Sequence, residues 1–270
     1  MSQSQIAKDT SLVTFAGAGP GSADHVTLAV ARALESADIV LHDALVGPEV
    51  LDLIGAQATR IRTGKQGFGP SMAQDEISAL IVDFALQGRR VLRLKSGDAS
   101  VFGRLNEEIA ALEAHGIGFR VLPGVTSASA ASAAIGQSLT ERGRNSELRI
   151  LTGHDTDGYT DSDWARLAAP GTVAAFYMGK KASRFIQGRL MMHGAAPSTP
   201  VTLVENVSQP DQRIWAANLA TLPDQASLCQ GPTVILFGLA PRAAVATLSL
   251  TDLHQPDHTA LEVHAREEAF

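Results

Sequence analysis

The sequence predicts an α/β protein built from two α/β halves. Short apolar runs alternate along the chain with segments of helical spacing, which is typical of α/β folds. Several of these runs end in glycine-rich or polar loops, as strands do at a binding edge. Pro123-Gly124 separates two stretches that each repeat the alternation, so we expect a domain boundary there.

Composition limits the class of protein. The 270 residues are 45% hydrophobic and 19% charged, enough for one large domain or two ordinary ones. A net charge of -6 argues against nucleic-acid binding. Cys229 is the only cysteine, which excludes a disulfide framework or thiolate cluster and favours a reduced, cytoplasmic setting. We expect no signal peptide and no membrane span, because no apolar run reaches the roughly 18 residues required.

Strand and helix patterns alternate through the N-terminal half, residues 11–122. After the first strand, Asp24 is the expected cap of a helix, and Ser71 begins an expected capping box before a helix that contains Ile77 and Ile81. A further helix contains Leu105 and Leu112. Strands are predicted at residues 12–15, 39–41, 60–62, 91–94 and 119–122.

The C-terminal half, residues 125–243, begins with a helix of small residues. Helices are predicted at 162–167 and 182–193, and an added antiparallel strand at 213–219. Residues 244–270 are polar and acidic, which predicts a mobile tail. The remaining strands are predicted at 148–152, 173–177, 201–205 and 233–237.

Ionisable residues follow the predicted strands of the first half. Asp43 follows the second strand and Lys65 the third, and both would face a cleft at the strand ends. Asp98 follows the fourth, within Ser96-Gly97-Asp98. It can bind a hydroxyl or amino group of a ligand, or it can cap the next helix.

Other chemistries find less support. The turn Gly17-Ala-Gly-Pro-Gly21, with Asp38 or Asp43 about 20 residues on, suggests a dinucleotide-dependent oxidoreductase. Ser22 replaces the third glycine of that fingerprint, which weakens the suggestion. The eight histidines are scattered without ligand spacing, so we expect no metal site.

Seven motifs together resemble the uroporphyrinogen-III C-methyltransferases of the tetrapyrrole methylase family, the class III S-adenosylmethionine-dependent methyltransferases. The resemblance runs in order from about Val13 to Leu239. The motifs are Gly17–Gly21, His42–Val46, Gly64-Lys65, Arg93–Arg104, Leu122–Ala128, Phe176–Gly179 and Val204–Asn206.

The resemblance implies two α/β domains with the active site in the cleft between them. It also implies S-adenosylmethionine as cofactor, a tetrapyrrole substrate and a homodimer. Asp43 and Lys65 match positions with proton-transfer roles, Arg104 and Glu107 match the porphyrinogen side, and Arg142 matches a substrate-binding position. The cofactor positions that it implies are Pro20, Ser96, Gly97, Asp98, Val101, Thr126, Ser127, Met178 and Val207.

The function that the resemblance implies is methylation of uroporphyrinogen III to precorrin-2, through precorrin-1, for sirohaem or cobalamin synthesis. The chain departs from the family's usual motifs, so two alternatives stay open: a methylase of another precorrin, or a divergent paralogue of low activity. A cofactor-binding protein without catalysis is a third. The departures include Ala44, Pro70, Ser96, Ala99, Ser100 and Glu141.

Overall fold

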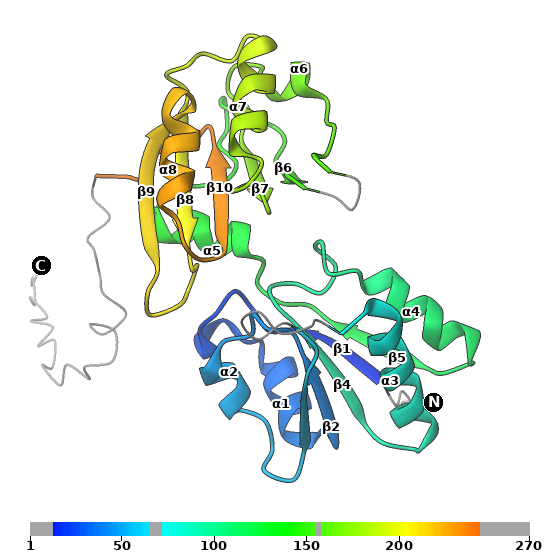
Figure 1. Ribbon diagram of the computed structural model, residues 1–270. Coiled ribbons are helices and arrows are strands. Elements are labelled where there is room, and N and C mark those ends of the chain that lie inside the picture. Colours follow the sequence, from blue (N-terminus) through cyan, green and yellow to red (C-terminus); the bar gives the residue numbers. More distant parts are fainter. Residues whose placement is uncertain (1–12, 65–71, 155–157, 244–270) are drawn as a thin grey trace, which may run out of the picture.

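The computed structural model describes residues 13–64, 72–154 and 158–243 and contains two five-stranded sheets, one in each half of the chain (Figure 1). The N-terminal half contains, in chain order, β1 (Val13–Gly17), η1 (Ala23–His25), α1 (Leu28–Ser36), β2 (Ile39–His42), α2 (Pro48–Asp52), β3 (Thr59–Arg62), α3 (Gln74–Leu86), β4 (Val91–Lys95), α4 (Leu105–Ala114) and β5 (Phe119–Leu122).

The first sheet is parallel, in the order β3-β2-β4-β1-β5. Strand β4 therefore lies between β1 and β2, with Arg93 in register with Phe15 on one side and Leu41 on the other. Because neighbouring strands run the same way, the loops after β1, β2, β4 and β5 emerge at one edge. That edge faces the C-terminal half.

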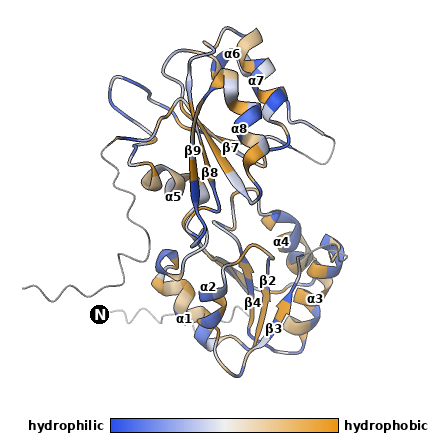
Figure 2. Cartoon of the chain, turned by 60° about the vertical axis from the view of Figure 1, so that its left-hand side comes forward, coloured by the Kyte–Doolittle hydropathy of each residue, from blue (hydrophilic) through white to orange (hydrophobic). Residues whose placement is uncertain are grey.

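Helices cover both faces of the first sheet, as a parallel sheet requires. Residues of α1 and α2 pack with Leu92 and Leu94 on one face, whereas α3 and α4 pack with Val91 and Phe15 on the other. In Figure 2, β2 and β4 are mostly hydrophobic, while hydrophilic residues recur along the covering helices.

The second sheet is mixed, in the order β6-β7-β10-β8-β9, with only β6 and β7 parallel. Helix α5 covers one face, and α6, α7 and α8 cover the other. Its half contains α5 (Ser127–Ala134), β6 (Arg149–Thr152), α6 (Trp164–Leu167), β7 (Ala174–Tyr177), α7 (Ser183–Met192), β8 (Pro200–Glu205), β9 (Arg213–Asn218), η2 (Leu219–Thr221), α8 (Leu222–Leu228) and β10 (Thr233–Phe237).

The predicted two α/β halves and their strands are confirmed, including the antiparallel β9. The cap at Asp24 is wrong: Thr27 caps α1 through a bond from the Val30 N–H, and Asp24 lies in a separate short turn. Helix α3 starts at Gln74 after Ala73, and Ser71 lies outside the described residues. The domain limits 11–122 and 125–243 stay predictions, and residues 244–270 lie outside the described part.

Candidate active site

A cavity of about 890 Å³ lies between the two halves and is lined by both. Its size falls within the roughly 300–1,000 Å³ of small-molecule sites. The N-terminal half lines it with the loops after β1, β2 and β4, through Pro20, residues 43–48, 96–98 and 101–103. The C-terminal half lines it with Thr126, Ser127, His154, Tyr177, Met178, Lys180, Lys181, Asn206, Val207, Gln209, Asp211 and residues 230–234.

Three glycines let the loop after β4 lie against β1 and the connection to α5. A Cβ at Gly17 would lie 2.6 Å from the Gly97 carbonyl oxygen and 2.7 Å from the Gly124 Cα. Gly97 also exchanges backbone hydrogen bonds with Gly19, at 2.8 and 3.1 Å. Only glycine permits this approach, so these positions set where the loop enters the cavity.

Asp98 ties this loop to the segment between the halves. Its Oδ2 accepts the Gly124 N–H at 2.9 Å, and its Oδ1 accepts the N–H and hydroxyl of Ser100 at 2.8 and 2.5 Å. Burial alone would raise the pKa of Asp98, but the bonds from Ser100 and Gly124 outweigh it and lower the pKa. Asp98 does not cap the next helix, because Arg104 precedes α4 in that position.

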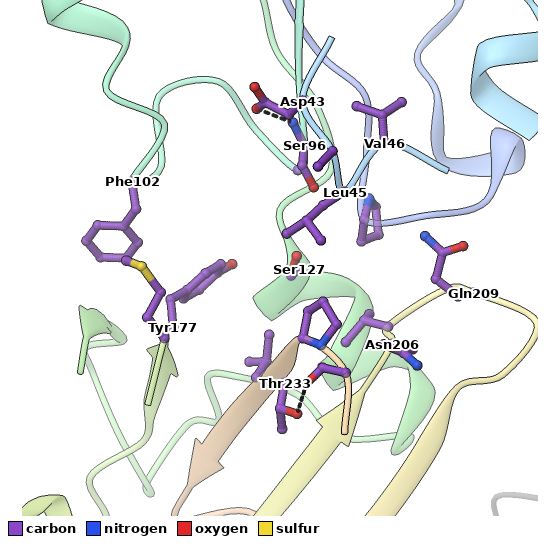
Figure 3. Close-up of a pocket in the computed structure, with 18 of the residues that line it drawn as sticks. Asp43, Leu45, Val46, Ser96, Phe102, Ser127, Tyr177, Asn206, Gln209 and Thr233 are labelled. Atoms are coloured by element: carbon purple, nitrogen blue, oxygen red, sulfur yellow. Dashed lines mark hydrogen bonds between the residues drawn. The ribbon is translucent and has the colours of Figure 1, made fainter. Parts of the chain in front are cut away.

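Asp43 presents its carboxylate at the cavity wall (Figure 3). Its Oδ1 lies 2.5 Å from Arg93 Nη2, and its Oδ2 accepts the Ser96 N–H at 3.3 Å. The side chain is 31% exposed, whereas that of Arg93 is 3% exposed. A carboxylate that is held from behind and open to the cavity is placed to accept a proton from a bound ligand.

Tyr177, at the end of β7, fixes the start of α5. Its hydroxyl shares a hydrogen bond with the Thr126 hydroxyl and accepts the Ala128 N–H at 2.8 Å. Burial raises the pKa of Tyr177, although these bonds oppose the rise. The Phe102 ring lies beside it, 5.4 Å between centroids, so an aromatic pair joins the two halves at the cavity (Figure 3).

Two buried or half-buried charges clamp the loop before β10, which lines the opposite wall. Glu205 Oε1 accepts the N–H groups of Gln230 and Gly231 at 2.5 and 2.6 Å. Lys180 Nζ donates to the carbonyls of Cys229, Gln230 and Gly231 at 3.2, 2.9 and 3.1 Å. Glu205 thus holds the N–H groups of this segment, and Lys180 holds its carbonyls.

Backbone strain gathers at the same place. Phe102, Met178 and Asn206 line the cavity with φ of 51°, 53° and 49°, and Arg104 and Ser208 follow nearby with φ of 53° and 64°. Such conformations cost about 1–3 kcal/mol for residues other than glycine and concentrate at functional sites.

The structure brings most of the predicted site residues together. Asp43 lines the cavity, as do all nine predicted cofactor positions: Pro20, Ser96, Gly97, Asp98, Val101, Thr126, Ser127, Met178 and Val207.

The other predicted site residues lie elsewhere. Arg104 and Glu107 form an exposed bidentate pair, at 2.7 and 2.6 Å, outside the cavity lining. That pairing lowers the pKa of Glu107. Arg142 is exposed and does not line the cavity. Lys65 lies outside the described residues.

Several functional candidates were not singled out from the sequence. Tyr177 lies in a quoted motif and ends a predicted strand, which was the available signal. Glu205 also lies in a quoted motif, Val204–Asn206, whereas Lys180 lies just outside one. The partners of both in the loop before β10 are more than 20 residues away in sequence, so these contacts were not predictable.

Of the two acidic residues that the dinucleotide alternative offers, Asp43 lines the cavity and Asp38 does not. Asp38 precedes β2 at the opposite edge of the sheet, and its carboxylate is 2.6 Å from Arg90. The described residues contain no cluster of three or more His, Cys, Asp or Glu able to hold a metal, and no helix among them is long and apolar enough to cross a membrane.

The sequence also matches a known protein family over most of its length. The profile described as Tetrapyrrole (Corrin/Porphyrin) Methylases matches residues 12–223, so the chain belongs to that family. Among curated proteins, it is 43% identical over 228 residues to a siroheme synthase of Pseudomonas putida, covering 84% of this chain and 49% of that protein. It is 40% identical over 238 residues to the siroheme synthase of Hahella chejuensis, covering 87% and 51%. The chain thus spans about half the length of these relatives.

A solved structure covers a similar share of this chain and nearly all of its own. Uroporphyrin-III C-methyl transferase from Thermus thermophilus, complexed with S-adenyl homocysteine, superposes with a TM-score of 0.72 at 32% identity, covering 84% of this chain and 96% of that one. A cobalt precorrin-4 methyltransferase superposes at 0.77 with 23% identity, which shows the shared fold.

Proposed function

We propose that this chain is an S-adenosylmethionine-dependent C-methyltransferase that converts uroporphyrinogen III to precorrin-2 through precorrin-1, serving sirohaem or cobalamin synthesis. One observation carries the proposal. All nine predicted cofactor positions, distant in sequence, meet in one cavity beside the Asp43 carboxylate. The relatives named siroheme synthase and uroporphyrin-III C-methyl transferase support the reaction and favour the sirohaem branch.

The cavity suits this cofactor chemically. Gly97 has a φ of 68°, and a Cβ built there would project into open space toward the Ser127 hydroxyl, 3.8 Å away. Its backbone is therefore accessible to a ligand. Val101 and Val207 supply apolar walls for a flat base, and the hydroxyls of Thr126 and Ser127 supply polar contacts. A cavity mostly apolar with a few polar groups is typical of cofactor sites.

The chemistry asks for positioning and for one base. The cofactor supplies an electrophilic methyl group on a sulfonium. A ring carbon of the substrate forms the new bond to that methyl, the carbon–sulfur bond breaks with its electrons going to sulfur, and the macrocycle then releases a proton. Asp43 is the base that the geometry favours, because its carboxylate faces the cavity. Glu107 is less suited, since it lies outside the cavity lining and Arg104 binds both of its carboxylate oxygens.

Cations at the site's margin suit a polycarboxylate substrate. Arg104 directly follows the lining residues Phe102 and Gly103. To bind a substrate carboxylate near that loop, its exposed guanidinium would exchange Glu107 for the substrate. Lys181 and His154 line the cavity from the other half. As the resemblance implies, Arg142 is proposed to bind substrate and Lys65 to take part in proton transfer. We also propose that the enzyme acts in the cytoplasm as a homodimer.

The test is an anaerobic incubation of the wild-type chain with S-adenosylmethionine and fresh uroporphyrinogen III, followed by mass spectrometry. We expect a gain of two methyl groups, greatly slowed by Asp43→Asn. Asp83→Asn, which changes an exposed carboxylate on α3, is the control and should match the wild type. Binding of S-adenosylhomocysteine without methyl gain would reject this acceptor. No binding would reject the class of enzyme.

A further inference from the structure

Two cations lie where the first sheet should be apolar. Arg93 and Lys95 belong to β4, the central strand, and each is 2% exposed. Alternate residues Leu92 and Leu94 fill the opposite face with ordinary core contacts. Removing a charge from water costs several kcal/mol, and well-packed apolar residues of similar size are often as stable or more so. Charges retained in this position therefore call for a role beyond packing.

Glu108 of α4 joins the two cations. Its side chain has no exposed surface. Its Oε1 lies 3.0 Å from Arg93 Nε and 2.9 Å from Lys95 Nζ, and its Oε2 lies 3.0 Å from the same lysine nitrogen. Gln74 of α3 adds a fourth bond, from Nε2 to Oε1 at 3.0 Å. Helix α4 thus carries this carboxylate, and helix α3 contacts it through Gln74.

The second carboxylate that Arg93 contacts is that of Asp43. Arg93 directs Nε to Glu108 and Nη2 to Asp43, while Nη1 donates to the Leu94 carbonyl at 3.3 Å. Two cations and two anions make the group neutral. Three of the four side chains are sealed, and Asp43 alone reaches the cavity.

We propose that Arg93 is a positioning residue that holds the Asp43 carboxylate toward the cavity, and that Glu108 in turn holds Arg93. The inference rests on the proposed function, in which Asp43 takes the proton released by the methylated macrocycle. Lys95 of β4 bonds to both oxygens of Glu108 of α4, so these buried contacts connect the helix to the strand and hold Glu108 in place. Asp43 then needs no reorganisation when substrate binds.

An arginine is required because one side chain has to bind two carboxylates through different nitrogens. Its planar group reaches Glu108 and Asp43 at once from different nitrogens, whereas a lysine offers one nitrogen on a flexible stem. Arg93→Lys keeps the charge and the strand but cannot make both contacts. Lysine in this buried place would stay with Glu108 and release Asp43.

The same two strands provide a matched control. Arg90 and Asp38 form a more exposed, bidentate arginine–aspartate pair just before β4 and β2, at the edge away from the cavity. Arg90→Lys makes the same exchange there. We expect it to leave turnover unchanged.

The experiment measures kcat, KM for uroporphyrinogen III and the Kd of S-adenosylhomocysteine for wild type, Arg93→Lys and Arg90→Lys. We expect Arg93→Lys to lower kcat about 100-fold, as misplacing a catalytic group does, with little change in KM or Kd. In an Asp43→Asn background, Arg93→Lys should lower kcat no further, because both act through one carboxylate. Equal kcat, or independent losses in the double variant, would overturn the inference.

Two further measurements keep the test decisive. Asp43→Glu leaves the buried groups intact and moves the carboxylate by one methylene. It should lose as much kcat as Asp43→Asn if position matters, and near wild-type kcat would count against positioning. Crystal structures of wild type and Arg93→Lys should show Asp43 ordered in the first and displaced in the second. Wild-type inactivity would refute the proposed function, and the crystal structures would then decide on positioning by themselves.

Discussion

Asp43 and Asp98 both follow strands and both line the cavity, yet their oxygens have different partners. Both carboxylate oxygens of Asp98 accept hydrogen bonds, from Gly124 and from Ser100, so Asp98 holds the loop in shape. Asp43 is held by Arg93 and Ser96 from one side and stays open to the cavity. Sequence position placed both at strand ends facing a cleft, and their partners in the folded chain show how differently the two carboxylates are used.

Asp98→Asn tests this structural role of Asp98. The amide oxygen of asparagine can replace one carboxylate oxygen as an acceptor. The amide nitrogen would replace the other, and it cannot accept the hydrogen bond that this oxygen now receives from a backbone N–H. A buried donor left unsatisfied costs about 1–3 kcal/mol. We therefore expect the Kd of S-adenosylhomocysteine to rise about tenfold or more by calorimetry. Ser100→Ala, which keeps the bond to Gly124, should have a smaller effect, and an unchanged Kd for Asp98→Asn would contradict this role.

Asp38 gives the fold a pH dependence. Its pKa falls from 3.8 to about 2, chiefly because the Arg90 side chain donates to it, with a further bond from the Arg90 N–H. A carboxyl whose pKa is lower in the folded state stabilises the fold above its ordinary pKa. That stabilisation is lost as the pH falls through the folded value.

Asp38→Asn should lower the free energy of unfolding by about 1 kcal/mol at neutral pH, since the pair is partly exposed. The difference from wild type should shrink between about pH 4 and about pH 2. Urea unfolding at several pH values measures it. A difference that grows on acidification would contradict the assignment.

At the scale of elements, the site depends on loops that are held in position by contacts with residues of other segments. The segment before β10 has both faces held, by Glu205 and by Lys180. The loop after β4 is held by the close approach of Gly17, Gly97 and Gly124. Such loops lose little further freedom when a ligand binds, which favours affinity.

Lys180→Met tests the clamp on the loop before β10. Three carbonyls would lose their shared cation, so we expect faster amide exchange at residues 229–231 and 233 and weaker binding of S-adenosylhomocysteine. Hydrogen exchange and calorimetry measure the two effects. Arg184→Met removes an exposed cation of α7 and is the control. Equal exchange in both variants would show that Lys180 does not order the loop.

Strand positions were predictable because their apolar runs are nearly continuous, as β1 and β10 show. The short helices α2 and α8, of five and seven residues, were missed because they are too brief for a clear period, and both carry proline near their start. The charges of β4 were visible in the sequence. Their meaning was not, because Glu108 and Asp43 approach Arg93 only after α4 and β2 pack around β4.

At the scale of the molecule, the cavity exists because two sheets meet at their loops. Direct bonds join the halves: Ser208 Oγ lies 2.6 Å from His25 Nδ1 and accepts the Ser22 N–H at 3.1 Å. The rings of Phe102 and Tyr177 add another contact between the halves, beside the cavity. The nine expected cofactor positions could be carried over from the family resemblance, whereas the sheet orders and the partners of Asp43 required the folded chain.

A crystal structure of the wild-type chain grown with S-adenosylhomocysteine tests the central claim most directly. The ligand should lie in the cavity between the halves, contacting the loop after β4 on one side and Met178 and Val207 on the other, with the Asp43 carboxylate open beside it. Density for the ligand elsewhere, or contact with one half only, would contradict the assignment of this cavity as the site of methyl transfer.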